Sequence, residues 1–474
     1  MRVYDKFYIN GEWVDPITPK SMDVINPANE EVCATISIGS AADVDVAAKA
    51  ARAAFASFGR STREERIAIL AALVEAYQKR YNDIADAISD EMGAPTKLAV
   101  EAQAATGIGH LATALEILQS YEFEEMAGNS KIIKEPIGVC GMITPWNWPI
   151  NQITCKVAPA LAVGCTVVLK PSEVAPLSGY LFTEVVHEAG VPAGVFNMIN
   201  GDGAGVGTAI SSHPEIDMVS FTGSTRAGSL VAQNAAPSIK RVTQELGGKS
   251  PNIVLDDVDL EAAISRSVMH MYNNTGQSCN APSRMLVPRA KLEQAEAIAA
   301  ATTEAVVVGD PKAEGTTMGP VVSEVQFNKI QGLIQAGIDE GAKLVCGGVG
   351  RPDGLEKGFY IKPTVFSNVT NDMTIAREEI FGPVLAMMPY DSIEEAIAIA
   401  NDTPYGLAGY VQGNNMDEVM DVASQIRAGN ININGKSGDL HTPFGGYKQS
   451  GNGREWGAHG FTDYLEVKAL SGAA

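Results

Sequence analysis

Apolar and polar positions alternate near the start of the chain, which is the pattern of short β-strands. Lys6–Ile9 and Glu12–Val14 show this alternation and flank Asn10-Gly11, a pair that favours a two-residue turn. These residues predict a β-hairpin at the N-terminus.

Beyond the hairpin the spacing of apolar residues becomes helical. Ser40 is expected to cap an Ala-rich helix that ends at Gly59, and Ser61 is expected to open a second helix. A third helix is predicted over about 98–118. The first part of the chain is therefore expected to be largely helical.

From about residue 137 short apolar runs alternate with helical segments. The runs predicted to be strands are 138–144, 166–169, 195–199, 218–222 and 241–245. The helices between them are expected to end at Gly190 or to start near Gly203 and Ser224. Such alternation is typical of βαβ units, in which helices cover both faces of a mostly parallel sheet.

A second alternating region begins near Asn252. Strands are predicted at 252–255, 285–287 and about 430–434. Helices are predicted near 260–273, 324–340, 393–401 and 416–427. We therefore expect an α/β protein with two open sheets.

Composition and charge exclude several classes of function. The chain has 474 residues, of which 45% are hydrophobic and 19% charged, as in soluble proteins of two or more domains. Its 35 Lys and Arg against 56 Asp and Glu give a net charge of −21. Because nucleic acids and anionic membranes attract basic faces, neither is an expected partner.

The sequence predicts neither a targeting segment nor a metal site. Residues 1–10 lack the apolar stretch of a secretory signal, and the run 157–169 is too short to span a membrane. The six cysteines contain no C-x-x-C pair, and the six histidines no H-x-H or H-E-x-x-H. We expect a soluble, cytoplasmic, metal-free protein.

Three residues are candidates for catalysis. Cys279 follows a predicted helix, where backbone N–H groups can lower a thiol pKa. Glu245 ends a buried strand before two glycines, a place suited to a general base. Asn147 is held between tryptophans and prolines and can donate to an oxyanion. Each also has a structural interpretation. Cys279 could be a buried apolar thiol, Glu245 could pair with Lys249 or another cation at the strand end, and Asn147 could satisfy loop backbone.

Other segments have features of a nucleotide site. Lys170 and Glu173 follow a strand and can bond ribose hydroxyls. Gly223 and Ser224 lie where a strand meets a helix, so a pyrophosphate can approach the helix N-terminus. The glycines of 203–207 either back an adenine or serve only as turn residues, and a G-x-G-x-x-G fingerprint is absent from the sequence.

Seven motifs taken together resemble one family. In chain order they are P-W-N-x-P, K-P-S-E, F-T-G-S-T-x-x-G, E-L-G-G-K-S, G-Q-x-C, E-E-I-F-G-P and P-F-G-G-Y-K-x-S-G-x-G-R-E. Each is weak alone, but their order over nearly the whole chain is that of aldehyde dehydrogenases. The chain resembles the NAD(P)-dependent branch that does not acylate coenzyme A.

The resemblance implies two Rossmann-like domains and a small β arm. Residues 1–119 and 139–246 would form the NAD-binding domain and 247–440 the catalytic domain. Residues 120–138 and 453–474 would form an oligomerisation arm. Because exposed strand edges need partners, a homodimer or homotetramer is expected.

The resemblance also implies a mechanism. Cys279 would attack the aldehyde, with the oxyanion of the thiohemiacetal held by Asn147 and the Cys279 N–H. Hydride transfer would leave a thioester, which water activated by Glu245 would hydrolyse to a carboxylic acid. Members that pass the acyl group to coenzyme A lack this carboxylate. Lys156 and Glu455 match a proton relay of the family or, alternatively, form a structural ion pair.

The cofactor contacts follow from the same resemblance. Lys170 and Glu173 would bind the adenosine ribose, and Glu173 would repel a 2′-phosphate, so NAD is expected in preference to NADP. Gly223 and Ser224 would face the pyrophosphate. The other expected contacts are Glu379 with the nicotinamide ribose, Phe381 beside the ring, Trp146 and Gly207.

The expected substrate channel departs from the usual family pattern. Its expected lining residues are Trp148, Gln152, Cys155, Asn280 and His441, with Asp439 in the same loop. No aromatic cage for a quaternary ammonium and no arginine clamp for a carboxylate stands out in the sequence. The channel is more polar than an aliphatic tunnel, which favours a polar or functionalised aldehyde.

Three rival functions are compatible with parts of the sequence. A catalytically silent member with a binding or structural role would be favoured by loss of Cys279, Glu245 or Asn147, and all three are present. A reductase of acyl phosphates or thioesters would share the cysteine but not need Glu245. A sugar-phosphate aldehyde oxidase would prefer phosphorylated substrates and usually NADP.

Overall fold

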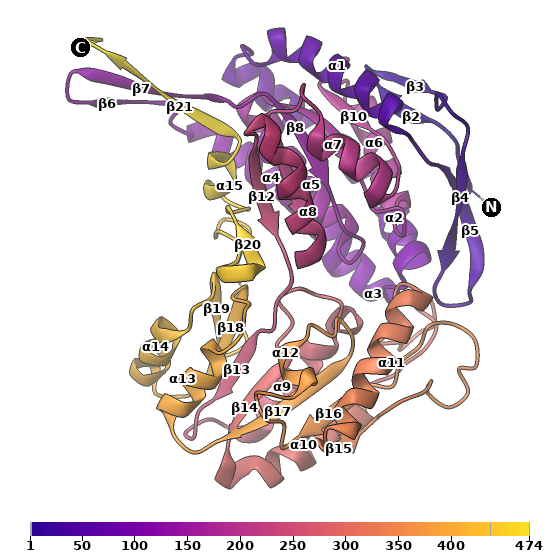
Figure 1. Ribbon diagram of the computed structural model, residues 1–474, viewed down its shortest axis with the longest axis vertical. Coiled ribbons are helices and arrows are strands. Elements are labelled where there is room, and N and C mark those ends of the chain that lie inside the picture. The colour runs from indigo at the N-terminus through magenta and orange to yellow at the C-terminus, as the bar shows by residue number, and fades with distance from the viewer. Residues whose placement is uncertain (1, 437, 474) are drawn as a thin grey trace.

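Two large β-sheets form the framework of the protein, and an arm of strands projects from it (Figure 1). The computed structural model describes residues 2–436 and 438–473. The large sheets have eight and seven strands, and two three-stranded sheets complete the fold. The expected α/β fold with two open sheets and a β arm is confirmed.

The first large sheet has the order β20-β12-β11-β8-β9-β10-β2-β3. Its strands are β2 (Phe7–Ile9), β3 (Glu12–Val14), β8 (Val139–Ile143), β9 (Thr166–Lys170), β10 (Phe196–Met198), β11 (Met218–Thr222), β12 (Arg241–Glu245) and β20 (Gly451–Asn452). The five neighbouring strands β10, β9, β8, β11 and β12 run parallel to one another. The predicted hairpin β2–β3 adds an antiparallel edge next to β10, and β20 adds one next to β12. The carboxyl ends of the parallel strands therefore meet at one edge, where α/β proteins place ligands.

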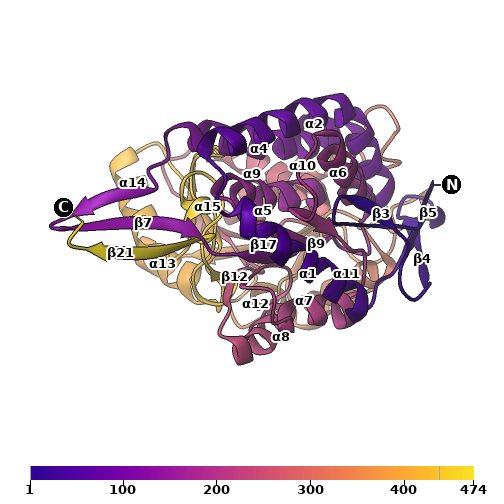
Figure 2. The same cartoon turned by 90° about the horizontal axis from the view of Figure 1, so that it is seen from above.

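Helices cover both faces of this sheet (Figure 2). They are α1 (Ala41–Phe58), α2 (Arg63–Met92), α3 (Thr96–Leu98), the π-helical turn Ala99–Ala104, α4 (Ala105–Ser120), α5 (Pro149–Val163), α6 (Leu177–Glu188), the π-helical turn Gly203–Gly207, α7 (Thr208–Ser212) and α8 (Thr225–Ala235). Val167 and Leu169 pack towards α2, α5 and α6, and Val168 towards α1 and α7. The buried parallel strand is thus apolar on both faces.

One predicted helix start is wrong by a residue. Thr62, not Ser61, caps α2, because its hydroxyl accepts from the Glu65 N–H at 3.2 Å while the Glu65 carboxylate accepts from the Thr62 N–H at 2.7 Å. This reciprocal pair is a capping box. The Ser61 hydroxyl instead donates to the carbonyl of Phe58, at the end of the preceding helix.

The second large sheet has the order β15-β16-β17-β14-β13-β18-β19. Its strands are β13 (Pro251–Val254), β14 (Arg284–Pro288), β15 (Lys343–Cys346), β16 (Thr364–Ser367), β17 (Val384–Tyr390), β18 (Ala408–Gln412) and β19 (Asn430–Ile433). Its helices are α9 (Leu260–Tyr272), α10 (Leu292–Glu304), α11 (Glu324–Asp339), α12 (Thr374–Arg377), α13 (Ile393–Asn401) and α14 (Met416–Gln425). The predicted elements of this region are present, but β15 to β18, α10 and α12 are additional to them.

The two small sheets lie at opposite ends of the protein (Figure 1). One contains β1 (Arg2–Tyr4), β5 (Glu31–Ser37) and β4 (Ser21–Asn26), and the other contains β21 (Leu465–Ser471), β7 (Ser130–Pro136) and β6 (Glu124–Ala127), preceded by α15 (His459–Thr462). The second small sheet is the projecting arm, in which β21 pairs antiparallel with β7. The N-terminal sheet has no counterpart among the predicted elements.

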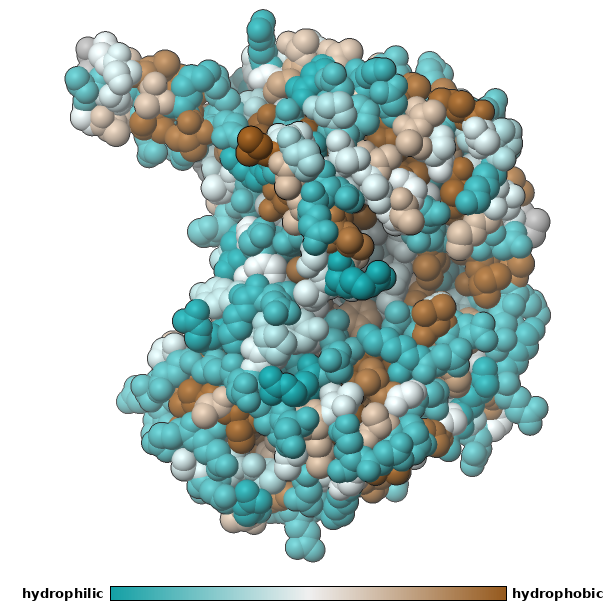
Figure 3. Space-filling model, in the orientation of Figure 1, coloured by the Kyte–Doolittle hydropathy of each residue, from teal (hydrophilic) through white to brown (hydrophobic). Residues whose placement is uncertain are grey.

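The arm exposes apolar side chains. Figure 3 shows hydrophobic residues along it, and Met126, Val467 and Leu470 are its exposed large apolar residues. Both outer strands, β6 and β21, have one free edge within the described chain. Such edges and side chains are usually covered in a native assembly.

A search of residues 2–436 and 438–473 finds no helix both long and apolar enough to cross a membrane. The same residues contain no cluster of three or more His, Cys, Asp or Glu side chains arranged to hold a metal ion.

Candidate active site

Cys279 lies where two cavities meet. One cavity, of about 230 Å³, is lined by Trp148, Gln152 and Asn280 among others. The other, of about 140 Å³, lies at the carboxyl ends of β8, β11 and β12 and is lined by Asn147 and Glu245. Cys279 lines both cavities. A thiol in this place can contact one ligand from each side.

The backbone that leads to Cys279 is held in an unusual conformation. Asn274, Thr275 and Gly276 have φ angles of 53°, 58° and 70°, all in the left-handed region. This region is unfavourable for a β-branched residue such as Thr275, so surrounding contacts must enforce it. At Gly276 a Cβ would lie 2.2 Å from the carbonyl oxygen of Gly382, so a larger residue does not fit.

Hydrogen bonds and a close backbone contact hold this loop. The Gln277 amide donates to the Asn274 carbonyl at 3.1 Å and accepts from the Val322 N–H at 2.9 Å. Across the site, a Cβ on Gly248 would lie 2.2 Å from the carbonyl oxygen of Cys279. Gly248 of the E-L-G-G-K-S motif is therefore required because two backbones meet there, whereas a Cβ on Gly247 would meet the Glu379 carboxylate.

Asn147 is fixed against the same loop. Its side-chain amide donates to the Gln277 carbonyl at 2.9 Å. Its own carbonyl accepts from the amides of Asn274 at 2.8 Å and Gln103 at 3.3 Å. Because an amide nitrogen carries two hydrogens, one is left to donate to a bound oxygen. This arrangement is that of an oxyanion donor, in addition to its loop-supporting role.

The Cys279 thiol has a raised pKa. The protein around this partly exposed side chain displaces water and raises the pKa, and the carboxylates of Glu379 and Glu245 raise it further. The N–H groups of Cys279 and Asn280 lower it, as the sequence predicts, but their effect is smaller. Activation of the thiol therefore requires a base or a bound positive charge.

Glu245 is buried and unpaired. Neither of its carboxylate oxygens has a hydrogen-bond partner among the described residues. Burial raises the pKa of Glu245 well above its usual value, and the nearby Glu455 carboxylate raises it further. The proposed ion pair with Lys249 is wrong, because the Lys249 ammonium is also buried without a partner in the described part of the chain. A raised pKa suits a general base.

Lys156 and Glu455 form a buried ion pair, and the charges of both act on Glu245. Burial alone would lower the pKa of Lys156, but the surrounding acidic groups, chiefly the Glu455 carboxylate, together offset this and the pKa is raised. Cys155 does not line the substrate-side cavity, contrary to the sequence prediction. Its thiol points to Glu455 instead, with Sγ 3.4 Å from Oε2.

Five of the predicted cofactor residues line the smaller cavity: Trp146, Gly223, Ser224, Glu379 and Phe381. Glu379 is held by the Gly248 N–H, which donates to its carboxylate at 2.8 Å. The rings of Trp146 and Phe381 meet edge to face, with centroids 5.3 Å apart. Ser224 caps α8 by accepting from the Ala227 N–H at 3.3 Å.

Lys170, Glu173 and Gly207 lie outside this cavity. The buried Lys170 ammonium donates to the carbonyl of Gly201 at 2.6 Å and pairs with Glu173 at 2.9 Å. Lys170 therefore orients Glu173, whose side chain is 27% exposed and accessible to a ligand. Gly207 is buried at the end of a π-helical turn capped by Asp202.

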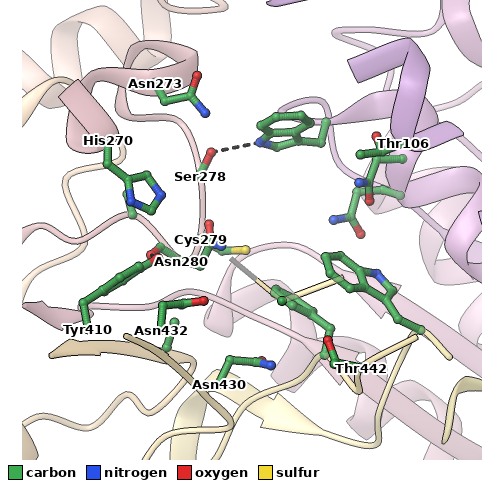
Figure 4. Close-up of a pocket in the computed structure, with 18 residues that line it drawn as sticks. Thr106, His270, Asn273, Ser278, Cys279, Asn280, Tyr410, Asn430, Asn432 and Thr442 are labelled. Carbon is green, nitrogen blue, oxygen red and sulfur yellow. Dashed lines mark hydrogen bonds between the residues drawn. The ribbon is translucent and has the colours of Figure 1, made fainter. Parts of the chain in front are cut away.

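The larger cavity is lined by aromatic rings and uncharged polar groups (Figure 4). Trp148 donates to the Ser278 hydroxyl at 2.9 Å, and Phe444 stacks on Trp456 with centroids 4.6 Å apart. The polar residues of the lining include Thr106, Asn151, Gln152, His270, Asn273, Asn280, Tyr410, Asn430, Asn432 and Thr442. None of the described lining residues is a lysine or an arginine.

A family model for aldehyde dehydrogenases matches residues 13–470. The chain belongs to the aldehyde dehydrogenase family. The resemblance carried by the seven motifs is thereby confirmed, and the protein is an aldehyde oxidoreductase. Neither a silent binding role nor reduction of activated acyl groups is favoured.

Several relatives of this aldehyde dehydrogenase are similar over their full length. A 3-succinoylsemialdehyde-pyridine dehydrogenase from Pseudomonas sp. is 55% identical over 100% of this chain and 99% of its own. The structure of an aldehyde dehydrogenase C mutant from Pseudomonas syringae, complexed with NAD+ and octanal, is 56% identical, with a TM-score of 0.98 over 99% of this chain and 97% of that chain. The structure of a Mycobacterium tuberculosis aldehyde dehydrogenase complexed with NAD+ is 41% identical, with a TM-score of 0.96 over 99% of this chain and 98% of that chain.

The substrate-side cavity contains residues that the sequence did not single out. Of the predicted channel residues, Trp148, Gln152 and Asn280 line it, but His441 does not and instead contacts Glu116 at 3.2 Å. The unpredicted lining residues include His270 on α9, Tyr410 on β18, Asn430 and Asn432 on β19, and Trp456. They belong to separate elements of this aldehyde dehydrogenase, so no local motif joins them.

Proposed function

We propose that this aldehyde dehydrogenase oxidises an uncharged aldehyde with a polar, flat distal group to its carboxylic acid, with NAD+ as the hydride acceptor. The position of Cys279 on the shared wall of two cavities supports this proposal most strongly. An aldehyde in the larger cavity and a nicotinamide in the smaller one would reach the same sulfur.

In this proposal the chain's own residues perform the acyl chemistry. Cys279 loses its thiol proton to water, which the positive charge of a bound nicotinamide would favour, and its Sγ adds as a thiolate to the aldehyde carbon. The Asn147 amide and the Cys279 N–H stabilise the oxyanion. After oxidation the acyl group remains on Sγ as a thioester. Glu245, which has no hydrogen-bond donor among the described residues, accepts a proton from the water that attacks this thioester. The acid leaves and the thiol is restored.

The smaller cavity has the donor set that a dinucleotide needs. NAD+ would supply the hydride acceptor there. Gly223 and Ser224 lie at the start of α8, which suits a pyrophosphate, and Glu379 suits the nicotinamide ribose. The hydroxyl of Thr222 is buried without a partner in the described residues, so a polar ligand group could satisfy it.

Two further predictions of the sequence are supported by the fold. The arm offers two strand edges and exposed apolar residues, which fits a homodimer or homotetramer. The proposed division into a domain of 1–119 and 139–246 and a domain of 247–440 is supported by the origin of the strands: apart from β20, the first large sheet uses the first domain and the second large sheet the second. Strand β20 lies within 441–452, which the division assigns to neither domain. Met1 and Ala474, at the limits of these ranges, lie outside the described residues. A cytoplasmic location stays a prediction.

The lining of the larger cavity supports the substrate class. The amide oxygens of Asn151 and Gln152 are buried without partners in the part of the chain that the structure describes. Such groups bind polar ligand atoms better than methylene groups, which would leave them unsatisfied. Trp148 and the stacked pair of Phe444 and Trp456 supply apolar aromatic surface against which a ring can pack. Because no lysine or arginine lines the described wall, a carboxylate substrate would be disfavoured.

The proposal is tested by comparing kcat/KM for a pyridyl keto-aldehyde, octanal and succinate semialdehyde. Polar groups left unpaired by an alkyl chain cost about 1–3 kcal/mol each, so we expect the pyridyl substrate to exceed octanal by about tenfold or more. Succinate semialdehyde should be slowest. Equal or higher kcat/KM for octanal would show that the cavity selects an aliphatic chain.

Replacing Glu173 by glutamine should weaken the preference for NAD. Glu173 is partly exposed, so its repulsion of a 2′-phosphate is screened and worth about 1 kcal/mol. We expect the ratio of kcat/KM for NADP to that for NAD to rise by about fivefold. Glu188→Gln, which changes an exposed carboxylate on α6, is the control. An unchanged ratio would mean that a group other than Glu173 distinguishes the 2′-hydroxyl of NAD from the 2′-phosphate of NADP.

A further inference from the structure

The Glu455 carboxylate is held by two consecutive residues of α5. Lys156 Nζ contacts Oε1, and Cys155 Sγ lies 3.4 Å from Oε2. The backbone of Glu455 is fixed as well, because its N–H donates to the Phe444 carbonyl at 2.7 Å and its carbonyl accepts from the Phe444 N–H at 2.8 Å. The Cys155 sulfur also lies 3.6 Å from the Gln152 carbonyl oxygen, but the Glu455 carboxylate is nearer and charged. Both carboxylate oxygens thus have a donor, which restricts the side chain to one orientation.

The Cys155 thiol remains a donor at neutral pH. Burial raises its pKa well above the usual value, and the negative charge of Glu455 raises it further. Cys155 is 2% exposed, so solvent does not compete for the S–H group. A neutral thiol beside a carboxylate donates a weak, charge-assisted hydrogen bond.

Glu455 in turn acts on Glu245. After burial, the charge of Glu455 is the largest cause that raises the pKa of Glu245. The other titratable or charged groups around this pair are Lys156 and Cys155 on α5, His110 on α4, Arg454, Asp463 and Tyr464. Of these, Cys155 and Lys156 contact the Glu455 carboxylate directly. Any change in the orientation of Glu455 therefore changes the field at Glu245.

We propose that Cys155 is a positioning residue for thioester hydrolysis: its thiol holds the Glu455 carboxylate against Lys156 and thereby sets the surroundings in which Glu245 takes a proton from water. This inference rests on the proposed roles of Glu245 and the Lys156–Glu455 pair. It gives Cys155 a function distinct from the channel-lining role predicted from its place in the sequence.

The test uses pre-steady-state and steady-state NADH formation by the full-length enzyme over a range of pH. In Cys155→Ala the first-turnover burst should stay at the wild-type rate, because Cys279 and Asn147 are untouched. Loss of a weak charge-assisted hydrogen bond should lower kcat by about 3- to 10-fold. The acid limb of kcat should also move, because a Glu455 carboxylate that is no longer held in one orientation changes the electrostatic field at Glu245.

Two variants control for folding and packing. Cys155→Ser keeps a donor of similar size and should restore most of kcat and the pH profile. Cys165→Ala removes another buried thiol, which donates to the Tyr464 carbonyl at 3.3 Å, and should leave both unchanged. If Cys165→Ala moves the acid limb as far as Cys155→Ala does, the effect is general packing and the inference is overturned.

Glu455→Gln separates this inference from the proposed function. An unchanged kcat and pH profile in Glu455→Gln would remove the Lys156–Glu455 pair from the mechanism. If Glu455→Gln slows hydrolysis while Cys155→Ala behaves like wild type, only the role of Cys155 fails. Adding Cys155→Ala to Glu455→Gln should cause no further loss of kcat, because the thiol acts through that carboxylate. If Cys155→Ala lowers kcat in the Glu455→Gln background as much as it does in the wild type, Cys155 does not act through Glu455.

Discussion

Cys279→Ala should abolish aldehyde-dependent NADH formation, with kcat lowered by more than about 10⁴-fold. The thiol is the only group on the shared wall of both cavities that can form a thiohemiacetal, among the residues that the structure describes. Alanine removes the nucleophile but keeps the backbone N–H and the loop conformation. NAD+ binding, followed by quenching of tryptophan fluorescence, should therefore be retained.

The matched control for this variant is Cys346→Ala. Cys346 is a partly exposed free cysteine on β15, at the outer edge of the second large sheet. It should keep wild-type activity. Residual activity of Cys279→Ala above about one per cent would assign the nucleophile to another residue. Loss of NAD+ binding in the same variant would point to damage of the loop rather than of the chemistry.

Glu245→Gln should separate the two halves of the reaction. The first turnover should still release NADH in a burst, because the thiol and the oxyanion donors are intact. Steady-state turnover should fall by about 10²- to 10⁴-fold, since an amide cannot accept the proton of the attacking water. Stopped-flow absorbance at 340 nm measures both phases. A steady-state rate equal to wild type would show that Glu245 is not the base.

The pH dependence gives an independent check on Glu245. Burial and Glu455 raise the pKa of its carboxyl well above the usual value. The protonated form, which cannot act as a base, therefore persists to higher pH than for an ordinary glutamate. Wild-type kcat should rise with pH as this proton is lost, and the rise should be absent from Glu245→Gln. The same pH rise in the variant would assign it to a different group.

The local sequence was sufficient for elements whose signals are short-range. The Asn10-Gly11 turn, the helix that ends at Gly59 and the helix near 393–401 are all present. Their caps, turns and apolar spacing act over only a few residues. The N-terminal strands β1, β4 and β5 are different. Strand β1 pairs with β5 residues about thirty positions away, and the partly exposed strands β4 and β5 lack a clear alternation.

The catalytic and cofactor motifs could also be predicted from the sequence, because each lies at the end of a strand or the start of a helix. Asn147, Gly223 and Glu245 follow or end neighbouring parallel strands, whose carboxyl ends meet at one edge of the sheet. Their order along the chain resembles that of one family, and the family match bears this out. Sequence alone thus determined the family, the class of reaction and the fold.

Only the tertiary structure decided which side chains meet across elements. Cys155 turns towards Glu455, some 300 positions away, rather than into the channel. Lys249 stays apart from Glu245 although only three residues lie between them. The far wall of the substrate-side cavity comes from α9, β18, β19 and Trp456. These contacts depend on how two sheets and a helix face one another, and such packing leaves no periodic or short-range signal in the chain.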